Sequence, residues 1–193
     1  MQAGAIDLAF VRPPIGDHRG LVLEPLLEED MLVVLPAGHP LLVLPSVPLA
    51  ELAKETFILF PRALSPGFHD SITEACRRAG FAPIRGQDTP DVVTGVLMVS
   101  TGFGITVVPR CVSRIHVDGT GYVPVEADGL RAPICLAYRR DDGSPAVRNF
   151  VAVARRLART VASASESTKI PIMPRAPSKT RAIAKKHSFD RYQ

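Results

Sequence analysis

Cysteine is scarce in this sequence, and its three cysteines, Cys76, Cys111 and Cys135, stand far apart. An odd number of cysteines without C-x-x-C spacing argues against a disulfide framework and against a structural zinc site. Long hydrophobic runs are absent as well, since no stretch of about 18 uninterrupted apolar residues occurs. The N-terminus lacks a charged start followed by an apolar core, which disfavours a secretory signal. We therefore expect a cytoplasmic protein with reduced thiols and no membrane span.

The net charge of +4 comes from one end of the chain. Residues 161–193 contain seven Lys and Arg side chains against two acidic ones, whereas residues 1–160 contain 16 basic and 17 acidic residues. The terminal segment is rich in Ser, Pro and Ala and cannot bury enough surface to offset its chain entropy. We expect 161–193 to be a disordered basic tail. A nucleic-acid-binding arm is the alternative, but neither interleaved aromatic residues nor a folded basic face supports it.

The stretch VSTGFGIT places Gly102 and Gly104 between two apolar segments. A dinucleotide-binding fingerprint requires glycines after a strand and before a helix, whereas here the expected order is helix, glycines, strand. The sequence also contains neither a G-x-x-x-x-G-K-[ST] loop nor a G-x-S-x-G nucleophile elbow. We therefore predict that Gly102 ends a helix and that Gly104 allows the next strand to pack closely.

Residues that could carry catalysis or bind a metal do not cluster along the sequence. None of the five histidines stands four residues from another potential ligand, so we expect no metal site. His69 and Asp70 are neighbours on an expected helix and should point to different faces. Cys76 falls on the apolar face of that helix, which predicts a core position. We predict that the protein is not an enzyme and holds no cofactor.

Short apolar segments alternate with amphipathic ones over residues 1–160. The expected strands cover 5–11, 21–36 in two pieces, 56–60, 104–109, 121–127 and 133–139. The expected helices are a short one capped by Ser46, one from a Ser65 hydroxyl cap and Pro66 to Gly80, one from Thr89 to Ser100, and an amphipathic one over 144–160. This alternation predicts an α/β fold with a mainly parallel sheet.

Four stretches of the sequence, in order and at the right spacing over about residues 4–160, resemble the effector-binding domain of LysR-type transcriptional regulators. They are GAIDLAFVRPP, EDMLVVLPAGHPL, TFILFPRALSPGFHDSITEACRRAGFAPI and VVTGVLMVSTGFGITVVP. The resemblance implies two Rossmann-like lobes, similar to type 2 periplasmic binding proteins, with a small-molecule effector in the cleft between them. The ILFPR…PG segment looks most like the branch that senses aromatic acids or their ring-cleavage products.

The resemblance also implies that this chain begins late in the domain. It starts near a late strand of the first lobe, without the winged helix-turn-helix and without the first strands of that lobe. We expect an effector-binding domain over 1–160, with an incomplete first lobe from 1–35 and about 125–160, and a second lobe from about 41–124. DNA contact would require the missing N-terminal domain, and a homo-oligomer is compatible with this organisation. The alternative is a stand-alone solute-binding or interaction module, or a non-functional fragment.

A candidate effector site follows from the two helix starts in the second lobe. Carboxylates bind at helix N-termini, where free N–H groups and the positive dipole end meet them. The expected starts at Ser65 and Thr89 follow extended segments and should open at one sheet edge. Arg62 precedes the first start and can bind a carboxylate through two hydrogen bonds. The resemblance implies that Pro61, Arg62 and Thr89 line the cleft, with Arg12 opposite. We expect a small aromatic or unsaturated carboxylate there; the alternative for each arginine is a solvated surface cation.

Overall fold

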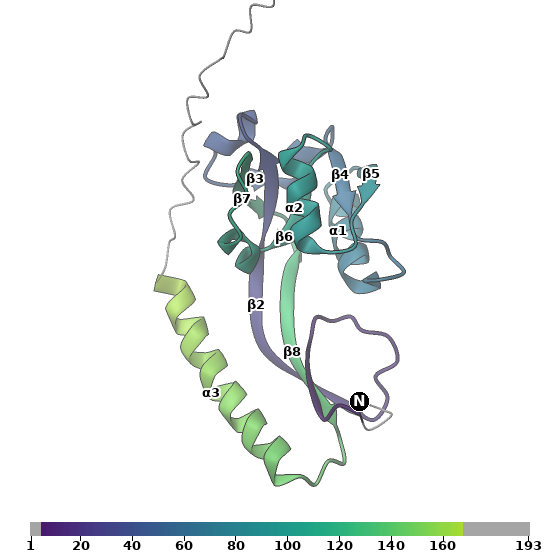
Figure 1. The fold of residues 1–193 in the computed structure, drawn as a ribbon, viewed down its shortest axis with the longest axis vertical. Coiled ribbons are helices and arrows are strands. Elements are labelled where there is room, and N and C mark those ends of the chain that lie inside the picture. Colours follow the sequence, from purple (N-terminus) through teal and green to yellow (C-terminus); the bar gives the residue numbers. More distant parts are fainter. Residues whose placement is uncertain (1–4, 168–193) are drawn as a thin grey trace, which may run out of the picture.

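The computed structural model describes the backbone of residues 5–167 and the side chains of residues 5–161. Its strands are β1 (Leu8–Val11), β2 (Leu21–Pro36), β3 (Val47–Pro48), β4 (Thr56–Leu59), β5 (Ile84–Asp88), β6 (Thr106–Pro109), β7 (Thr120–Glu126) and β8 (Arg131–Arg139). Its α-helices are α1 (Pro66–Arg78), α2 (Val92–Ser100) and α3 (Pro145–Ser167), and short 3-10 helices cover η1 (Pro40–Val43), η2 (Leu49–Leu52) and η3 (Arg110–Arg114). These elements form two lobes that the long strands β2 and β8 connect (Figure 1).

The second lobe is built on a mixed sheet in which one strand opposes all the others. β4 pairs parallel with β5, and a parallel bridge joins Phe57 of β4 to Ile105, the residue before β6. β6 and β7 flank β2 and both run antiparallel to it, while β3 pairs parallel with β7. Five strands of this lobe therefore share one direction, and β2 alone runs the opposite way.

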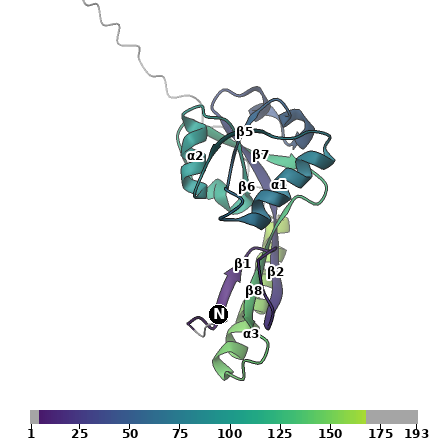
Figure 2. The same cartoon turned by 90° about the vertical axis from the view of Figure 1, so that its right-hand side faces the viewer.

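Helices α1 and α2 cover opposite faces of this sheet, as Figure 2 shows. The five residues from Met31 to Leu35 are all buried, which is typical of a strand covered on both faces. Alternate residues of β2 enter different cores because successive side chains of a strand point to opposite faces. Val33 packs in the core that contains Ile72 of α1, whereas Val34 packs in the core that contains Val96 of α2.

Strand β2 belongs to both lobes. We expected two extended pieces over 21–36, but the chain forms one strand of 16 residues with a register shift between Pro25 and Leu27. Its first half pairs with β8, and its second half pairs with β6 and β7. The bulge lets Pro25, which has no N–H to donate, remain within the strand without ending it.

The first lobe is a three-stranded sheet in the order β1-β8-β2, with α3 packed on one face. All of its pairings are antiparallel, so the expectation of a mainly parallel sheet is wrong here. The antiparallel order arises because β2 leaves this lobe and β8 returns to it. Helix α3 continues to Ser167, past the expected end at 160, and residues 168–193 of the expected tail lie outside the described residues. Within the described part, no helix is both long and apolar enough to cross a membrane.

The helix starts differ in detail from the sequence-based expectation. Ser65 is the N-cap residue of α1, as expected, but its hydroxyl makes no capping hydrogen bond. Helix α2 is capped by Asp91 rather than Thr89, because the Asp91 carboxylate accepts a hydrogen bond from the Thr94 N–H at 2.9 Å. Ser46 caps no helix: η2 begins after Pro48, and the Ser46 hydroxyl bonds to Glu126 instead.

The turn after α2 confirms the prediction for its two glycines. Gly102 has φ +86° and donates its N–H to Val99, while the N–H of Phe103 reaches back to Met98. This paired pattern ends a helix with a left-handed residue. At Gly104, with φ +141°, a Cβ atom would lie 2.3 Å from the carbonyl oxygen of Thr56. Glycine is therefore required at Gly104 for β4 and β6 to lie side by side.

Candidate functional site

The ends of β4 and β5 meet at one edge of the second lobe. The N–H of Thr89, just after β5, donates to the carbonyl of Leu59, the last residue of β4, at 3.0 Å. Pro61 follows β4 by two residues, so the structure brings Pro61 and Thr89 to the same edge, as expected. Thr89 is fully buried, and its hydroxyl donates to the Asp91 carbonyl at 2.7 Å. Because this hydroxyl already donates its proton within the protein, the Thr89 side chain stabilises the edge and has no proton left to donate to a ligand.

The N-terminus of α1 adjoins this edge. The Pro61 carbonyl accepts hydrogen bonds from the N–H groups of Leu64 and Ser65, which folds the chain tightly into the helix. The Ser65 hydroxyl is half-buried and makes no hydrogen bond within the described residues. The first N–H groups of any α-helix lack partners inside the helix. Ser65 and the first turn of α1 therefore present hydrogen-bonding groups that a ligand can use.

Arg62 is engaged by a carboxylate of the protein itself. Its Nε and Nη2 atoms donate to the two Asp70 carboxylate oxygens at 2.8 and 2.9 Å. The Arg62 guanidinium, and secondarily His69, hold the pKa of Asp70 at about 2. The Arg62 side chain is 68% exposed, so the pair lies at the surface. Arg62 could bind an external carboxylate only by sharing or releasing Asp70.

His69 is a polar group that the sequence-based prediction missed. It was expected to point away from Asp70, but its Nδ1 lies 3.1 Å from Asp70 Oδ1. The ring is 8% exposed, and Nε2 is buried with no hydrogen-bond partner in the described part of the chain. The sequence did carry a signal for this buried position: His69 stands in the first turn of an expected helix, on the face that carries Ile72 and Cys76.

Arg12 lies where the two lobes meet. Its Nη2 is 2.6 Å from Glu29 Oε2, and its Nη1 donates to the Ala132 carbonyl at 3.0 Å. Glu29 and Ala132 are opposite each other on β2 and β8, so Arg12 fastens the segment after β1 to both connecting strands. Glu29 also accepts a hydrogen bond from the Cys111 N–H at the start of η3. Arg12 therefore bridges elements of both lobes, and its guanidinium is occupied.

The loop that follows Arg12 reaches the start of α1. A Cβ atom at Gly67 would lie 2.4 Å from the carbonyl oxygen of Pro14. The glycine thus lets the first lobe touch the helix N-terminus directly. This contact brings the Arg12 segment close to the edge formed by Pro61, Ser65 and Thr89, even though the Arg12 side chain turns to Glu29.

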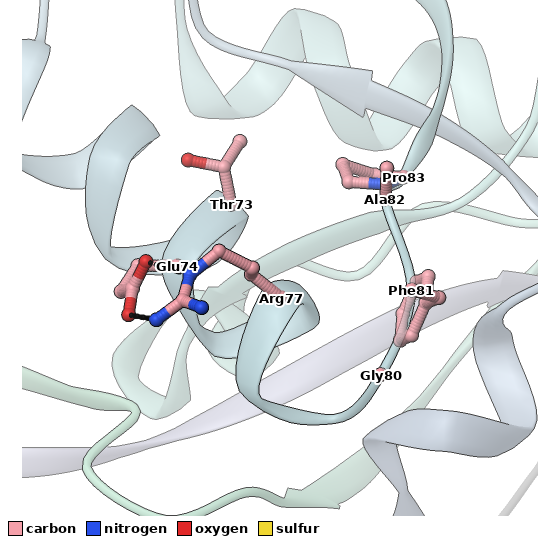
Figure 3. A pocket seen from close by; sticks show the side chains of 7 residues that line it. All are labelled: Thr73, Glu74, Arg77, Gly80, Phe81, Ala82 and Pro83. Atoms are coloured by element: carbon pink, nitrogen blue, oxygen red, sulfur yellow. Dashed lines mark hydrogen bonds and ion pairs between the residues drawn. The ribbon is translucent and has the colours of Figure 1, made fainter.

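A separate hollow of about 580 Å³ lies at the other end of α1. Figure 3 shows the ion pair between Glu74 and Arg77 on one side of it and Phe81 on the loop across from them. None of the five expected site residues lines this hollow. Among the described residues, no group of three His, Cys, Asp or Glu side chains could hold a metal ion.

The two-lobed α/β fold is that of the effector-binding domains of LysR-type regulators. The sequence matches the LysR substrate binding domain family over residues 1–159, and the chain belongs to that family. It is 34% identical to the HTH-type transcriptional regulator CatR of Pseudomonas putida over 148 residues, which cover 77% of this chain and 50% of CatR. It is 30% identical to the HTH-type transcriptional regulator BudR of Raoultella terrigena over 146 residues, which cover 76% of this chain and 50% of BudR.

Solved structures agree with this assignment. The BenM effector-binding domain with its effector benzoate superposes with a TM-score of 0.73 at 25% identity, covering 88% of this chain and 75% of that one. Full-length CbnR in complex with its target DNA shares the fold, with a TM-score of 0.74 at 23% identity, 82% of this chain and 55% of CbnR. The chain spans about half the length of the curated relatives that it matches.

Proposed function

We propose that this chain is the effector-sensing part of a LysR-type regulator and that it binds a small aromatic or unsaturated carboxylate. The binding residues would be Pro61, Arg62, Ser65 and Thr89 of the second lobe, with Arg12 on the side of the first lobe. The protein would bind its effector without transforming it. The observation that carries the proposal is the meeting of the β4 and β5 ends with the N-terminus of α1.

Two polar groups at this place support a ligand. The Ser65 hydroxyl has no hydrogen bond within the described residues, and neither has the buried Nε2 of His69. An unpaired buried polar atom costs free energy, which a bound molecule can recover by accepting or donating a hydrogen bond. Phe60, the residue after β4, and Phe68 of α1 supply apolar surface beside these groups. Their rings pack edge to face with centres 5.1 Å apart. The BenM domain, with a similar fold, has benzoate as its effector.

Binding by this site should be weak. The Arg62 guanidinium must divide its hydrogen bonds between Asp70 and the effector, and Arg12 is held by Glu29. Each charge-assisted hydrogen bond contributes roughly 1.5–3 kcal/mol, and association entropy offsets part of the sum. We expect dissociation constants between about 1 μM and 1 mM.

An NMR titration with benzoate and with muconate tests the site. Amide shifts should concentrate near Ser65 and Thr89, and Arg62→Ala should weaken binding at least about tenfold. Arg77→Ala is the matched control, because Arg77 forms a similar two-point pair with Glu74 at the opposite end of α1. No shift near Thr89 would show that the site is wrong, and unchanged affinity in Arg62→Ala would remove Arg62 from it.

We further propose that recognition of DNA by such a regulator depends on residues outside this chain. In the described residues, α1, α2 and α3 each pack on a sheet, and none stands free to enter a major groove. Binding of the isolated chain to DNA should be sequence-independent and should fall steeply with salt. An electrophoretic shift on one operator that survives excess nonspecific competitor would contradict this.

A further inference from the structure

The Nε2 atom of His69 is buried beside the start of α1 and has no partner. The His69 residue is 8% exposed, and among the described residues Nε2 is the one buried side-chain nitrogen or oxygen without a hydrogen bond. Buried polar atoms in proteins are nearly always paired, because leaving one unpaired costs free energy. A ligand that brings the complementary polar group to Nε2 recovers this cost.

The partner of the other ring nitrogen decides what Nε2 can bind. Nδ1 lies 3.1 Å from Oδ1 of Asp70, the oxygen that also accepts a hydrogen bond from Nε of Arg62 at 2.8 Å. The Arg62 guanidinium lowers the pKa of Asp70 to about 2, so the carboxylate is ionised at neutral pH and can only accept. Nδ1 must therefore carry the ring proton. In a neutral imidazole the second nitrogen then has no proton, so Nε2 is an acceptor.

The place of His69 on α1 directs its ring toward the edge that Pro61 and Thr89 form. Ile72, one turn later on the same face, packs in the core that contains Leu59, the last residue of β4. His69 is one turn nearer the helix N-terminus, and the side chains of a helix lean toward that end. Because Nδ1 is turned to a carboxylate at the surface, the buried Nε2 is turned inward, toward the ends of the strands.

A carboxylate cannot satisfy an acceptor, whereas a hydroxyl group can. The carboxylate of an effector has its donors in Arg62 and in the first N–H groups of α1. These donors lie close to Nε2, since Arg62 and His69 contact the same oxygen of Asp70. One small ring that bears both a carboxylate and a hydroxyl can therefore meet both kinds of group. An effector without the hydroxyl leaves Nε2 unpaired, which lowers its affinity.

We propose that His69 selects effectors with a hydroxyl group on the ring, and that its Nε2 accepts the hydrogen bond from this hydroxyl. The proposal rests on the proposed function, because the carboxylate of the same molecule binds at Arg62 and at the start of α1. The preferred effector is then a hydroxy-substituted aromatic acid, and unsubstituted benzoate is a weaker ligand.

A ligand reaches Nε2 only after part of the surrounding protein moves, because the atom is shut off from solvent. The first lobe covers the helix turn that precedes His69, since Pro14 contacts Gly67 there. Withdrawal of the loop that contains Pro14 uncovers this turn, and its return encloses the ligand between the lobes.

Titrations of the 193-residue chain with benzoate, the three hydroxybenzoates and the matching methoxybenzoates test the role of His69. They are performed at about pH 8, where imidazole rings are mostly neutral. At least one hydroxybenzoate should bind about tenfold or more tightly than benzoate, because a site with an unpaired acceptor disfavours ligands without the donor. The methoxy analogue of that isomer should show no gain, since it has no proton to donate.

Substitutions of His69 connect this preference to Nε2. His69→Phe removes the acceptor and keeps a ring, so the ratio of the hydroxybenzoate and benzoate affinities should fall to about one. His69→Gln supplies an acceptor oxygen and should retain part of the preference. His116→Phe, the same change at an exposed histidine, is the matched control and should leave the ratio as it is. Circular dichroism checks the fold of each variant.

Nitrogen-15 NMR of the chain labelled at histidine gives a readout that needs no variant. His69 should show an unprotonated Nε2 in the free protein, and the resonance of this nitrogen should move upfield when hydroxybenzoate binds. A proton on Nε2 in the free protein would overturn the proposal, and so would a preference for hydroxybenzoate that persists in His69→Phe.

The titrations also separate this proposal from the proposed function. Equal affinities for benzoate and all three hydroxybenzoates, with amide shifts near Thr89, would overturn the role of His69 and leave the effector site in place. A chain that binds none of these acids would contradict both.

Discussion

Arg12 and Glu29 form an ion pair of 2.6 Å that fastens the segment after β1 to the strand shared by both lobes. The pair is only partly exposed, with 33% of the Arg12 side chain and 18% of the Glu29 side chain accessible to solvent. Glu29 uses its second oxygen to accept the Cys111 N–H at 3.0 Å. One carboxylate thus connects β2, the Arg12 segment and η3.

Glu29→Ala should lower the free energy of unfolding by about 1–3 kcal/mol, because the partly buried Arg12 guanidinium loses its carboxylate partner and the Cys111 N–H loses its acceptor. Urea denaturation followed by circular dichroism measures the change. Asp17→Ala is the control: Asp17 pairs with Arg19 at the surface, where an ion pair contributes little. Equal losses in the two variants would contradict a special role for Glu29.

Gly104→Ala should destabilise the protein by more than about 2 kcal/mol, since the new Cβ would meet the Thr56 carbonyl and the residue would keep φ +141°. Gly16→Ala is the matched control, because no atom lies within 4 Å of a Cβ built at that glycine and its φ is not positive. Thermal unfolding of both variants measures the two losses of stability. A Gly104→Ala protein as stable as the control would show that β4 and β6 can separate at little cost.

The second lobe was the more predictable part of the fold. Helices beginning after Ser65 and near residue 90, and the glycine turn at 102–104, follow from local signals: a cap position, helical spacing and positive φ. The direction of the strands could not be predicted in this way. Strand β2 passes through both lobes, and its antiparallel pairing is a long-range property that no local pattern encodes.

The position of the candidate site could be predicted from the sequence. Which of its side chains are already paired within the protein could not. Pro61 and Thr89 meet because parallel strands end at a common edge, which alternation of strands and helices indicates. Each arginine pairs with a carboxylate farther along the chain, Arg12 with Glu29 and Arg62 with Asp70. Tertiary contacts decide whether a guanidinium group is already paired. The sequence alone therefore indicated that both arginines could bind an effector.

The stability of the protein should depend on Asp70 at low pH. Arg62 stabilises the ionised carboxylate and lowers its pKa from 3.8 to about 2. A carboxyl group with a lowered pKa stabilises the folded state above its ordinary pKa, and this contribution is lost as the pH falls through the folded value. Unfolding measured between pH 4 and pH 2 should therefore show a loss of stability that is smaller in Asp70→Asn. An equal loss of stability between pH 4 and pH 2 in both proteins would show that the Arg62–Asp70 ion pair does not form in solution.

The same substitution should strengthen effector binding if Arg62 contacts the effector. Asp70 competes with an external carboxylate for the two N–H donors of Arg62. Asp70→Asn removes that competitor's charge, and the affinity for benzoate should rise by up to about tenfold in a calorimetric or NMR titration. Glu74→Gln frees Arg77 at the far end of α1 and controls for the general loss of a negative charge. If both variants bind benzoate equally well, the gain is not local to Arg62; if Asp70→Asn binds more weakly, Asp70 positions Arg62 for the effector and does not compete with it.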